Sequence, residues 1–422
     1  MGQGWIIGHL FGIPLRIHPS WFLVLFFLAG AFFRPLYGQL LPSQGLEATQ
    51  PLLWGISLLT ALLLFLSVLL HELGHSLVAL RQGVRVRSIT LYLFGGVASI
   101  ERECGSPNGA LLVAAAGPAV SLLLAFGLGI LAQAPLPSLP LVGIVASRLA
   151  ELNLVLALFN LLPGLPLDGG LILKALVWKV SGSRSRGTRV AAQTGSLLGL
   201  LAILLGVWLS LSLGAIGGLW LAVLGWFGLG ASRSQLQLLR LQQAMLDLSV
   251  GKAMARRFRV LESSLSLRQL SERLIADHNS SPDWLLVCEG HHWLGWVDGA
   301  VLKQLPVQSW DQELLRDHLR PLGSLSSVLE REPLWRAALL LEETRDARLL
   351  VLSPAGLPSG TLDRIDLVNA VSEKLELRLP AAFLEQARKS GLYPPGLPLG
   401  VVARGMAALP DLDPEQPQRQ RS

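Results

Sequence analysis

The sequence predicts a polytopic α-helical membrane protein with six transmembrane helices, followed by a cytoplasmic α+β domain. Of its 422 residues, 51% are apolar and only 15% are charged, whereas soluble domains carry about 25% charged residues. Residues 1–230 consist mostly of long apolar runs, and residues 231–422 have the composition of a soluble protein. This pattern argues against an ordinary cytosolic enzyme and against disorder over most of the chain.

Six apolar runs are long enough, or nearly so, to cross the hydrocarbon core of a bilayer, which takes about 20 helical residues. We place these spans at residues 19–37, 52–80, 108–132, 141–163, 190–210 and 214–231. Residues 1–230 are therefore expected to form a single six-span unit.

Lys and Arg residues are concentrated in alternate connections between the spans. The connections after the second and fourth spans are basic, whereas residues 38–51, 133–140 and 211–213 contain neither Lys nor Arg. The positive-inside rule then places the N-terminus, both basic connections and the C-terminal half in the cytoplasm, with the spans in the cell (inner) membrane. The net charge of +6 belongs to this asymmetry, and no basic run alternates with aromatic residues as expected for nucleic-acid binding.

The second span contains the run His71-Glu72-Leu73-Gly74-His75. Residues four apart share one face of a helix, so both imidazoles can reach one ion. Zn²⁺ accepts neutral histidine nitrogens and leaves room for a carboxylate and a water. Glu72 lies beside the pair, where it can take a proton from that water. Because ionisable groups at membrane depth are costly and usually functional, a metal site is favoured over histidines that are only structural.

Asp168 is the best candidate for a third ligand. The two cysteines, Cys104 and Cys288, are too few and too far apart for a thiolate site. Asp168 ends a segment, starting at Asn160, in which prolines and glycines interrupt an apolar run. Irregular backbone at membrane depth is tolerated only where protein or a water-filled cavity surrounds it. The alternative, a helix-capping Asp, is less favoured beside the second-span motif.

The pairing of HELGH with NLLPGLPLDGG inside a six-span core resembles the site-2 protease family of intramembrane zinc metalloproteases. The resemblance implies one Zn²⁺ per chain, bound by His71, His75 and Asp168, with Glu72 as the catalytic base. It also implies a role for Asn160, eight residues before Asp168, in substrate binding or oxyanion stabilisation.

Two shorter segments resemble the same family. Phe94–Val97 is similar to a glycine-containing β-hairpin that dips into the membrane, on which an unwound substrate pairs, and Ala116–Ser121 is similar to a small-residue motif of the third span. The resemblance implies an endopeptidase that cleaves single-span membrane proteins within or near their transmembrane segments. The alternatives are a catalytically silent scaffold, against which the intact set of site residues argues, and a transporter, which predicts inverted repeats that the sequence lacks.

The soluble half contains two similar units. Residues 250–305 and 320–376 each run from a helical segment through two strands to another helix, which suggests an internal duplication. We expect residues 231–249 to form a linker helix. Residues 377–422 are rich in proline and polar residues, and we expect a largely disordered tail.

The duplicated region, residues 250–376, resembles a tandem pair of cystathionine-β-synthase-type (CBS) modules, most clearly at Gly360–Leu367. The resemblance implies an adenine nucleotide whose ribose hydroxyls are held by Asp366. However, Asp363 replaces the usual Ser or Thr, and the first unit lacks the later Asp. A ligand-free module that dimerises the chain or docks a partner is an equally good interpretation.

Overall fold

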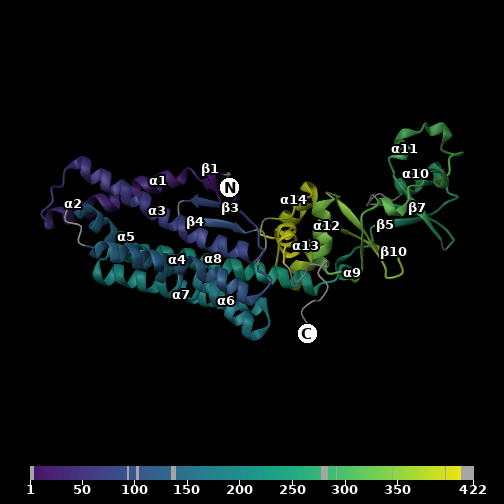
Figure 1. Ribbon diagram of the computed structural model, residues 1–422. Coiled ribbons are helices and arrows are strands. Elements are labelled where there is room, and N and C mark those ends of the chain that lie inside the picture. The colour runs from purple at the N-terminus through teal and green to yellow at the C-terminus, as the bar shows by residue number, and fades with distance from the viewer. Residues whose placement is uncertain are drawn as a thin grey trace. The chain divides into compact units, whose positions relative to one another are not determined.

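The computed structural model describes residues 4–92, 95–100, 104–134, 139–276, 284–290, 292–344, 346–394 and 396–409 (Figure 1). The chain divides into two compact units, with the boundary between Leu239 and Arg240.

The first unit is mainly helical. Among the described residues, five helical stretches are long and apolar enough to cross a membrane. They are α1 to α2 (Ser20–Phe27 and Arg34–Ser43, joined by the π-helical segment Leu28–Phe33), α3 (Gln50–Arg81), α4 (Pro107–Gln133), α5 (Pro140–Asn160) and α7 (Arg184–Leu213). They coincide with the first five predicted spans.

The sixth predicted span, residues 214–231, falls in α8 (Ile216–Asp247), which is not among these five stretches. Several glycines and two tryptophans dilute its apolar character. The helix also continues without a break into most of the predicted linker, residues 231–249. The count of six spans therefore stays a prediction.

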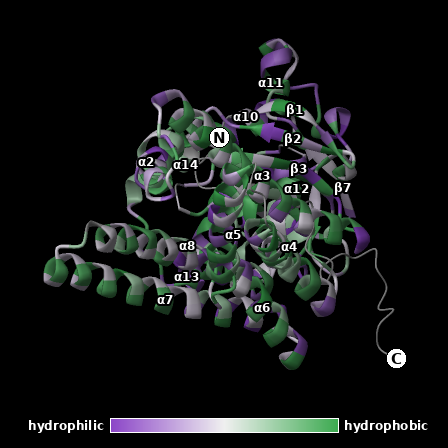
Figure 2. Cartoon of the chain, turned by 60° about the vertical axis from the view of Figure 1, so that its left-hand side comes forward, coloured by the Kyte–Doolittle hydropathy of each residue, from purple (hydrophilic) through white to green (hydrophobic). Residues whose placement is uncertain are grey.

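The outward surfaces of these helices carry large apolar side chains. On α7, for example, Leu204, Trp208 and Leu211 are exposed, and Figure 2 shows hydrophobic residues along most of that helix. Extended apolar surfaces of this kind are rare on soluble monomers and are expected where a protein meets lipid.

A four-stranded sheet accompanies the helices. Its strands are β1 (Trp5–Leu10), β2 (Ile13–Ile17), β3 (Val86–Tyr92) and β4 (Gly95–Ile100), in that order across the sheet. Strands β2 and β3 are parallel, and the other two pairs are antiparallel. Ile13, Leu15 and Ile89 of the sheet pack in one buried cluster with Leu73 of α3.

The antiparallel β3–β4 pair lies where the membrane-dipping hairpin around Phe94–Val97 is expected, and Phe94 itself lies outside the described residues. The sequence did not reveal that this hairpin belongs to a larger sheet. The position of the hairpin relative to a bilayer stays a prediction.

The second unit contains two three-stranded sheets with the same pattern of pairing. In each sheet a parallel pair is followed by an antiparallel pair. The strands are β5 (Phe258–Glu262), β6 (Trp284–Glu289) and β7 (His292–Val297) in one sheet, and β8 (Ser327–Leu329), β9 (Arg348–Leu352) and β10 (Pro358–Asp363) in the other. This shared topology is what an internal duplication requires.

Short helices flank these sheets. They are α9 (Val250–Ala253), α10 (Leu267–Ala276), α11 (Val301–Gln304), α12 (Leu334–Glu343) and α13 (Arg364–Lys374), with 3₁₀ turns at Val307–Ser309, Leu315–His318 and Leu322–Ser324.

The expectation of a largely disordered tail over residues 377–422 is wrong for residues 381–407. Two helices form there, α14 (Ala381–Ser390) and α15 (Leu399–Ala407), and α15 packs against α12. The buried residues of α15 include Leu399, Val402, Ala403 and Met406. Their helical spacing supplies an apolar face, which the surrounding prolines and polar residues obscured in the sequence. Residues 410–422 lie outside the described residues.

Candidate metal centre

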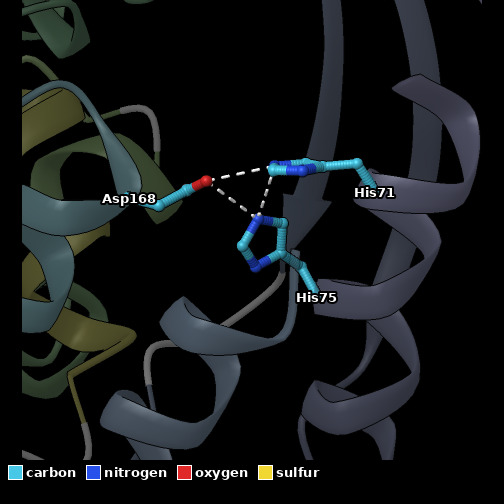
Figure 3. Close-up of side chains that lie close together, drawn as sticks. All are labelled: His71, His75 and Asp168. Carbon is cyan, nitrogen blue, oxygen red and sulfur yellow. Dashed lines mark hydrogen bonds and ion pairs between the residues drawn. The ribbon is translucent and has the colours of Figure 1, made fainter. Parts of the chain in front are cut away.

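Three side chains converge inside the first unit (Figure 3). His71 and His75 lie on α3, and Asp168 is the first residue of α6 (Asp168–Ser181). Asp168 Oδ2 is 3.1 Å from His71 Nε2 and 3.3 Å from His75 Nε2, and the two Nε2 atoms are 3.3 Å apart. Both histidines are buried, and the Asp168 side chain is 16% exposed. The structure thus brings together the three residues that the sequence indicated as ligands.

The other ring nitrogens of the histidines are held by α4. His75 Nδ1 lies 2.7 Å from the carbonyl oxygen of Val113, which can only accept, so Nδ1 carries the proton and Nε2 keeps its lone pair. His71 Nδ1 lies 2.9 Å from Ser121 Oγ. Such outer partners commonly orient metal-ligating histidines. Sequence reasoning did not assign these roles, although Ser121 ends the small-residue motif of the third span.

Gly117 lets α4 come close enough to make these contacts. A Cβ atom at position 117 would overlap His75 Nε2 and would lie 2.6 Å from His71 Nε2. Any larger residue there would occupy the space in front of the two ligand nitrogens. The small-residue motif Ala116–Ser121 therefore has a specific task, which is to leave the histidine nitrogens accessible.

Asp168 is positioned by a compact loop between α5 and α6. A Cβ on Gly169 would overlap the carbonyl oxygen of Leu161, and a Cβ on Gly170 would overlap the backbone at Gly164. The two glycines after Asp168 therefore let the loop fold tightly over the start of α6. Asp168 stands within the helix rather than at its N-cap, which is Leu167.

Glu72 lies next to the three side chains, on the same turn of α3 as His71. Its side chain is partly buried and packs against strand β4. A Cβ atom on Gly96 of that strand would lie only 2.5 Å from Glu72 Cγ. The backbone of Ala98, also on β4, is a hydrogen-bond partner of the Glu72 carboxyl group. The sheet therefore restrains this carboxyl group beside the ligand nitrogens.

Asn160 is the last residue of α5 and is partly exposed. Within the described ranges its side chain makes no hydrogen bond or ion pair. The structure does not join it to the three converging side chains, so its role stays a prediction.

The donor set fits a zinc ion. Two imidazole nitrogens and one carboxylate oxygen make up a common set of protein ligands in catalytic zinc sites, where a fourth position stays open. Tetrahedral ligands at about 2.0–2.1 Å from zinc lie about 3.3 Å from one another, which is close to the 3.1–3.3 Å separations found here.

Comparisons with known proteins show the family to which this chain belongs. The model for peptidase family M50 matches residues 59–139 and 138–203. A predicted zinc metalloprotease of Synechocystis sp. is 36% identical over 369 residues, which cover 86% of this chain and 94% of the relative. The chain belongs to peptidase family M50, the site-2 protease family. With its apolar helices, this membership indicates a multi-pass membrane protein.

Solved structures similar to this chain include the site-2 protease from Methanocaldococcus jannaschii, at 29% identity and a TM-score of 0.37, covering 55% of this chain and 94% of that one. They also include the CBS domain of a bacterial CNNM/CorC family Mg²⁺ transporter in complex with ATP. That domain has 14% identity and a TM-score of 0.27, and the match covers 33% of this chain and 96% of that one.

In the second unit, Asp366 is engaged by protein groups on both carboxylate oxygens. Oδ1 accepts a hydrogen bond of 2.6 Å from the Arg257 guanidinium, and Oδ2 accepts one of 3.0 Å from the N–H of Asp363. Asp363 in turn caps α13 and pairs with Arg257 at 2.5 Å. The Asp366 carboxylate is thus buried and already accepts protein hydrogen bonds on the oxygens that would bind a ribose. The sequence had not indicated this role of Arg257.

Replacing Gly117 with Ala should remove the metal site. The added methyl group overlaps the ligand nitrogens, so we expect zinc affinity to fall by at least the roughly 10–100-fold typical of lost supporting contacts. Zinc retained by the purified protein against a graded chelator measures this effect. Gly127→Ala, on the same helix, is the matched control, because a Cβ atom at position 127 would meet nothing within 4 Å. Equal zinc retention in both variants would contradict the geometry described above.

Replacing Arg257 with Ala should destabilise the second unit in a pH-dependent way. Burial and the neighbouring Asp363 raise the pKa of Asp366 to about 6. Because this value lies above the unfolded value, the group favours folding at low pH, and its contribution is lost as pH rises through about 6. Without Arg257, Asp366 loses its ion-pair partner at pH 8, and Asp363 keeps the Arg348 guanidinium at 3.8 Å. We expect a cost of about 2–3 kcal/mol, less than for a fully buried pair.

At pH 5 the cost of Arg257→Ala should be smaller, because Asp366 is then largely protonated. Hydrogen exchange of the α13 amides in the full-length protein measures the destabilisation caused by Arg257→Ala at pH 5 and at pH 8. Arg256→Ala, at the exposed neighbouring position, is the control. An equal effect of Arg257→Ala at pH 5 and pH 8 would contradict this account of the ion pair.

Proposed function

We propose that this protein is a zinc-dependent intramembrane endopeptidase that cleaves single-span membrane proteins within or near their transmembrane segments. The observation that supports it best is the convergence of two imidazole nitrogens and one carboxylate oxygen, with Glu72 beside them, in an apolar helical unit. Membership of peptidase family M50 supports the same reaction class.

In this proposal His71, His75 and Asp168 hold one zinc ion per chain, and Glu72 acts as the general base and then as the general acid. When bound, zinc lowers the pKa of a water molecule and polarises a peptide carbonyl. The Glu72 carboxylate takes a proton from the attacking water and later delivers it to the leaving amine. Contact with β4 holds this carboxyl group at one position throughout. The role of Asn160, at the end of α5, in substrate binding or oxyanion stabilisation is part of this proposal.

The substrate must present an extended segment to this site. A transmembrane helix hides its carbonyl groups in its own hydrogen bonds, so local unwinding precedes cleavage. Strand β4 is the last strand of its sheet and lies beside Glu72. An unwound substrate can add to such an edge as a further strand, which would carry its backbone past the catalytic residues.

We further propose that the second unit is a cytoplasmic regulatory domain and that the chain crosses the cell membrane with its N-terminus on the same side. The positions of Lys and Arg between the spans support this orientation. The pairing of Asp366 with Arg257 favours a ligand-free module that mediates homodimerisation or docking over an adenine-nucleotide sensor.

Replacing Glu72 with Gln separates metal binding from catalysis. Gln keeps the size of the side chain but cannot accept the proton, so we expect zinc content to stay at one per chain and kcat to fall by about 10²–10⁴-fold. Cleavage of a single-span membrane protein in proteoliposomes and metal analysis of the same preparation give the two readings. If the variant cleaves at the wild-type rate, Glu72 is not the base. If the wild-type protein binds zinc but cleaves nothing, the silent scaffold is favoured.

A further inference from the structure

The loop that carries Asp168 is fastened at Leu165, three residues before the ligand. The Leu165 N–H donates a hydrogen bond of 3.2 Å to the carbonyl oxygen of Ala191 on α7. The Leu165 carbonyl oxygen accepts one of 2.6 Å from Ser232 Oγ on α8. The backbone N–H and carbonyl groups of Leu165 are therefore both hydrogen-bonded to helices that contribute no ligand to the metal centre.

The contact around Ser232 is buried and closely packed. Ser232 is 0% exposed, and the Leu165 side chain packs in one cluster with Ala191, Ala192 and Leu236. Leu236 lies one turn after Ser232 on α8, so the same face of the helix supplies the hydrogen bond and the apolar contact. A Cβ on Gly195 of α7 would lie 2.6 Å from Ser232 Oγ and would overlap the Leu165 oxygen. Glycine at position 195 thus leaves room for this hydrogen bond.

The segment between Leu165 and Asp168 transmits this restraint to the ligand. The Leu167 N–H donates to the carbonyl oxygen of Gly164 at 3.0 Å, and the Gly170 N–H donates to that of Leu167 at 3.0 Å. Gly169 also packs against the backbone of Leu161. These contacts hold the segment from Leu165 to Asp168 together as one rigid piece. A shift at Leu165 therefore moves the Asp168 carboxylate relative to the two histidines.

We propose that Ser232 is a positioning residue for the metal centre: its hydrogen bond to Leu165 sets the place of Asp168 and so the affinity for the metal. The proposal rests on the zinc site of the proposed function, but not on the identity of any substrate. Ser232 touches none of the reacting groups and acts only through the loop.

Ser232 lies on the part of α8 that belongs to the first unit. Helix α8 is continuous from Ile216 to Asp247, and its residues from Arg240 onward belong to the second unit. Ser232 thus lies about two turns before the unit boundary.

The test compares Ser232→Ala with Ser234→Ala in the full-length protein. Ser234 is exposed, and among the described residues its hydroxyl group bonds only within its own helix, to the carbonyl oxygen of Gly230. We expect Ser232→Ala to weaken zinc binding by about tenfold, as the loss of a supporting hydrogen bond does at other zinc sites, and Ser234→Ala to leave it unchanged. Chelator competition gives the affinity, and the visible spectrum of the Co²⁺-substituted protein reports ligand geometry.

A merely structural role for Ser232 would leave the Co²⁺ spectrum of the folded variant like that of the wild type. An unchanged spectrum with unchanged zinc affinity in Ser232→Ala would overturn the proposal. If that variant fails to assemble, Ser232→Cys tests the same contact, because a thiol nearly keeps the size of the side chain but is only a weak donor to the Leu165 carbonyl oxygen. A smaller loss of zinc affinity is then expected, and no loss overturns the proposal.

The outcome for the proposed function is read separately. A wild-type protein that binds zinc but cleaves no peptide bond overturns the endopeptidase and leaves the role of Ser232 to be decided by the affinities. A wild-type protein that binds no zinc overturns both.

Discussion

The convergence of His71, His75 and Asp168 on one point inside an apolar helical unit is the constraint on which the rest of the first unit depends. Each of these groups is costly to bury without a partner. The structure supplies the partners in layers, with α4 binding the outer nitrogens of the histidines and the α5–α6 loop presenting the carboxylate. A cation at the centre would complete this arrangement, because it would satisfy the three inward-facing atoms together.

Small residues make the convergence possible. Gly117 leaves space before the ligand nitrogens, Gly96 leaves space for Glu72, and Gly195 leaves space for the bond between Ser232 and Leu165. All three positions lie where a backbone passes close to a polar contact, so the glycines serve the site rather than local chain flexibility. The sheet, α4 and α7 thus take part in the metal centre without giving it a ligand.

The sequence predicted much of this site because its strongest signals are local. The spacing of His71 and His75 fixes one helical face, and the broken run before Asp168 marks an unusual loop. The roles of Ser121, Val113 and Ser232 could not be predicted, because each depends on a contact between residues distant in sequence, and in the case of Val113 on a backbone oxygen. The strands β1 and β2 were missed for a related reason, since β2 pairs with β3 across the whole length of α3.

In the second unit too, local sequence patterns predicted some features, whereas contacts between residues distant in sequence could not be predicted. Strand patterns predicted the duplicated topology, but the prediction of a disordered tail was wrong, because the proline-rich and polar composition there obscures the helical spacing of Leu399, Val402 and Met406. The Arg257–Asp366 pair was also invisible, since its partners are separated by more than one hundred residues along the chain. In the first of the two duplicated modules, Asp298 corresponds to Asp363 and lies 3.4 Å from Arg320, in a more exposed setting.

X-ray absorption at the zinc edge of the purified wild-type protein tests the central claim most directly. The account predicts one zinc per chain, with only nitrogen and oxygen neighbours and the outer-shell scattering of two imidazoles. Cys104 and Cys288 are buried and stand outside the centre, so a sulfur neighbour would contradict the account, as would a protein that retains no zinc.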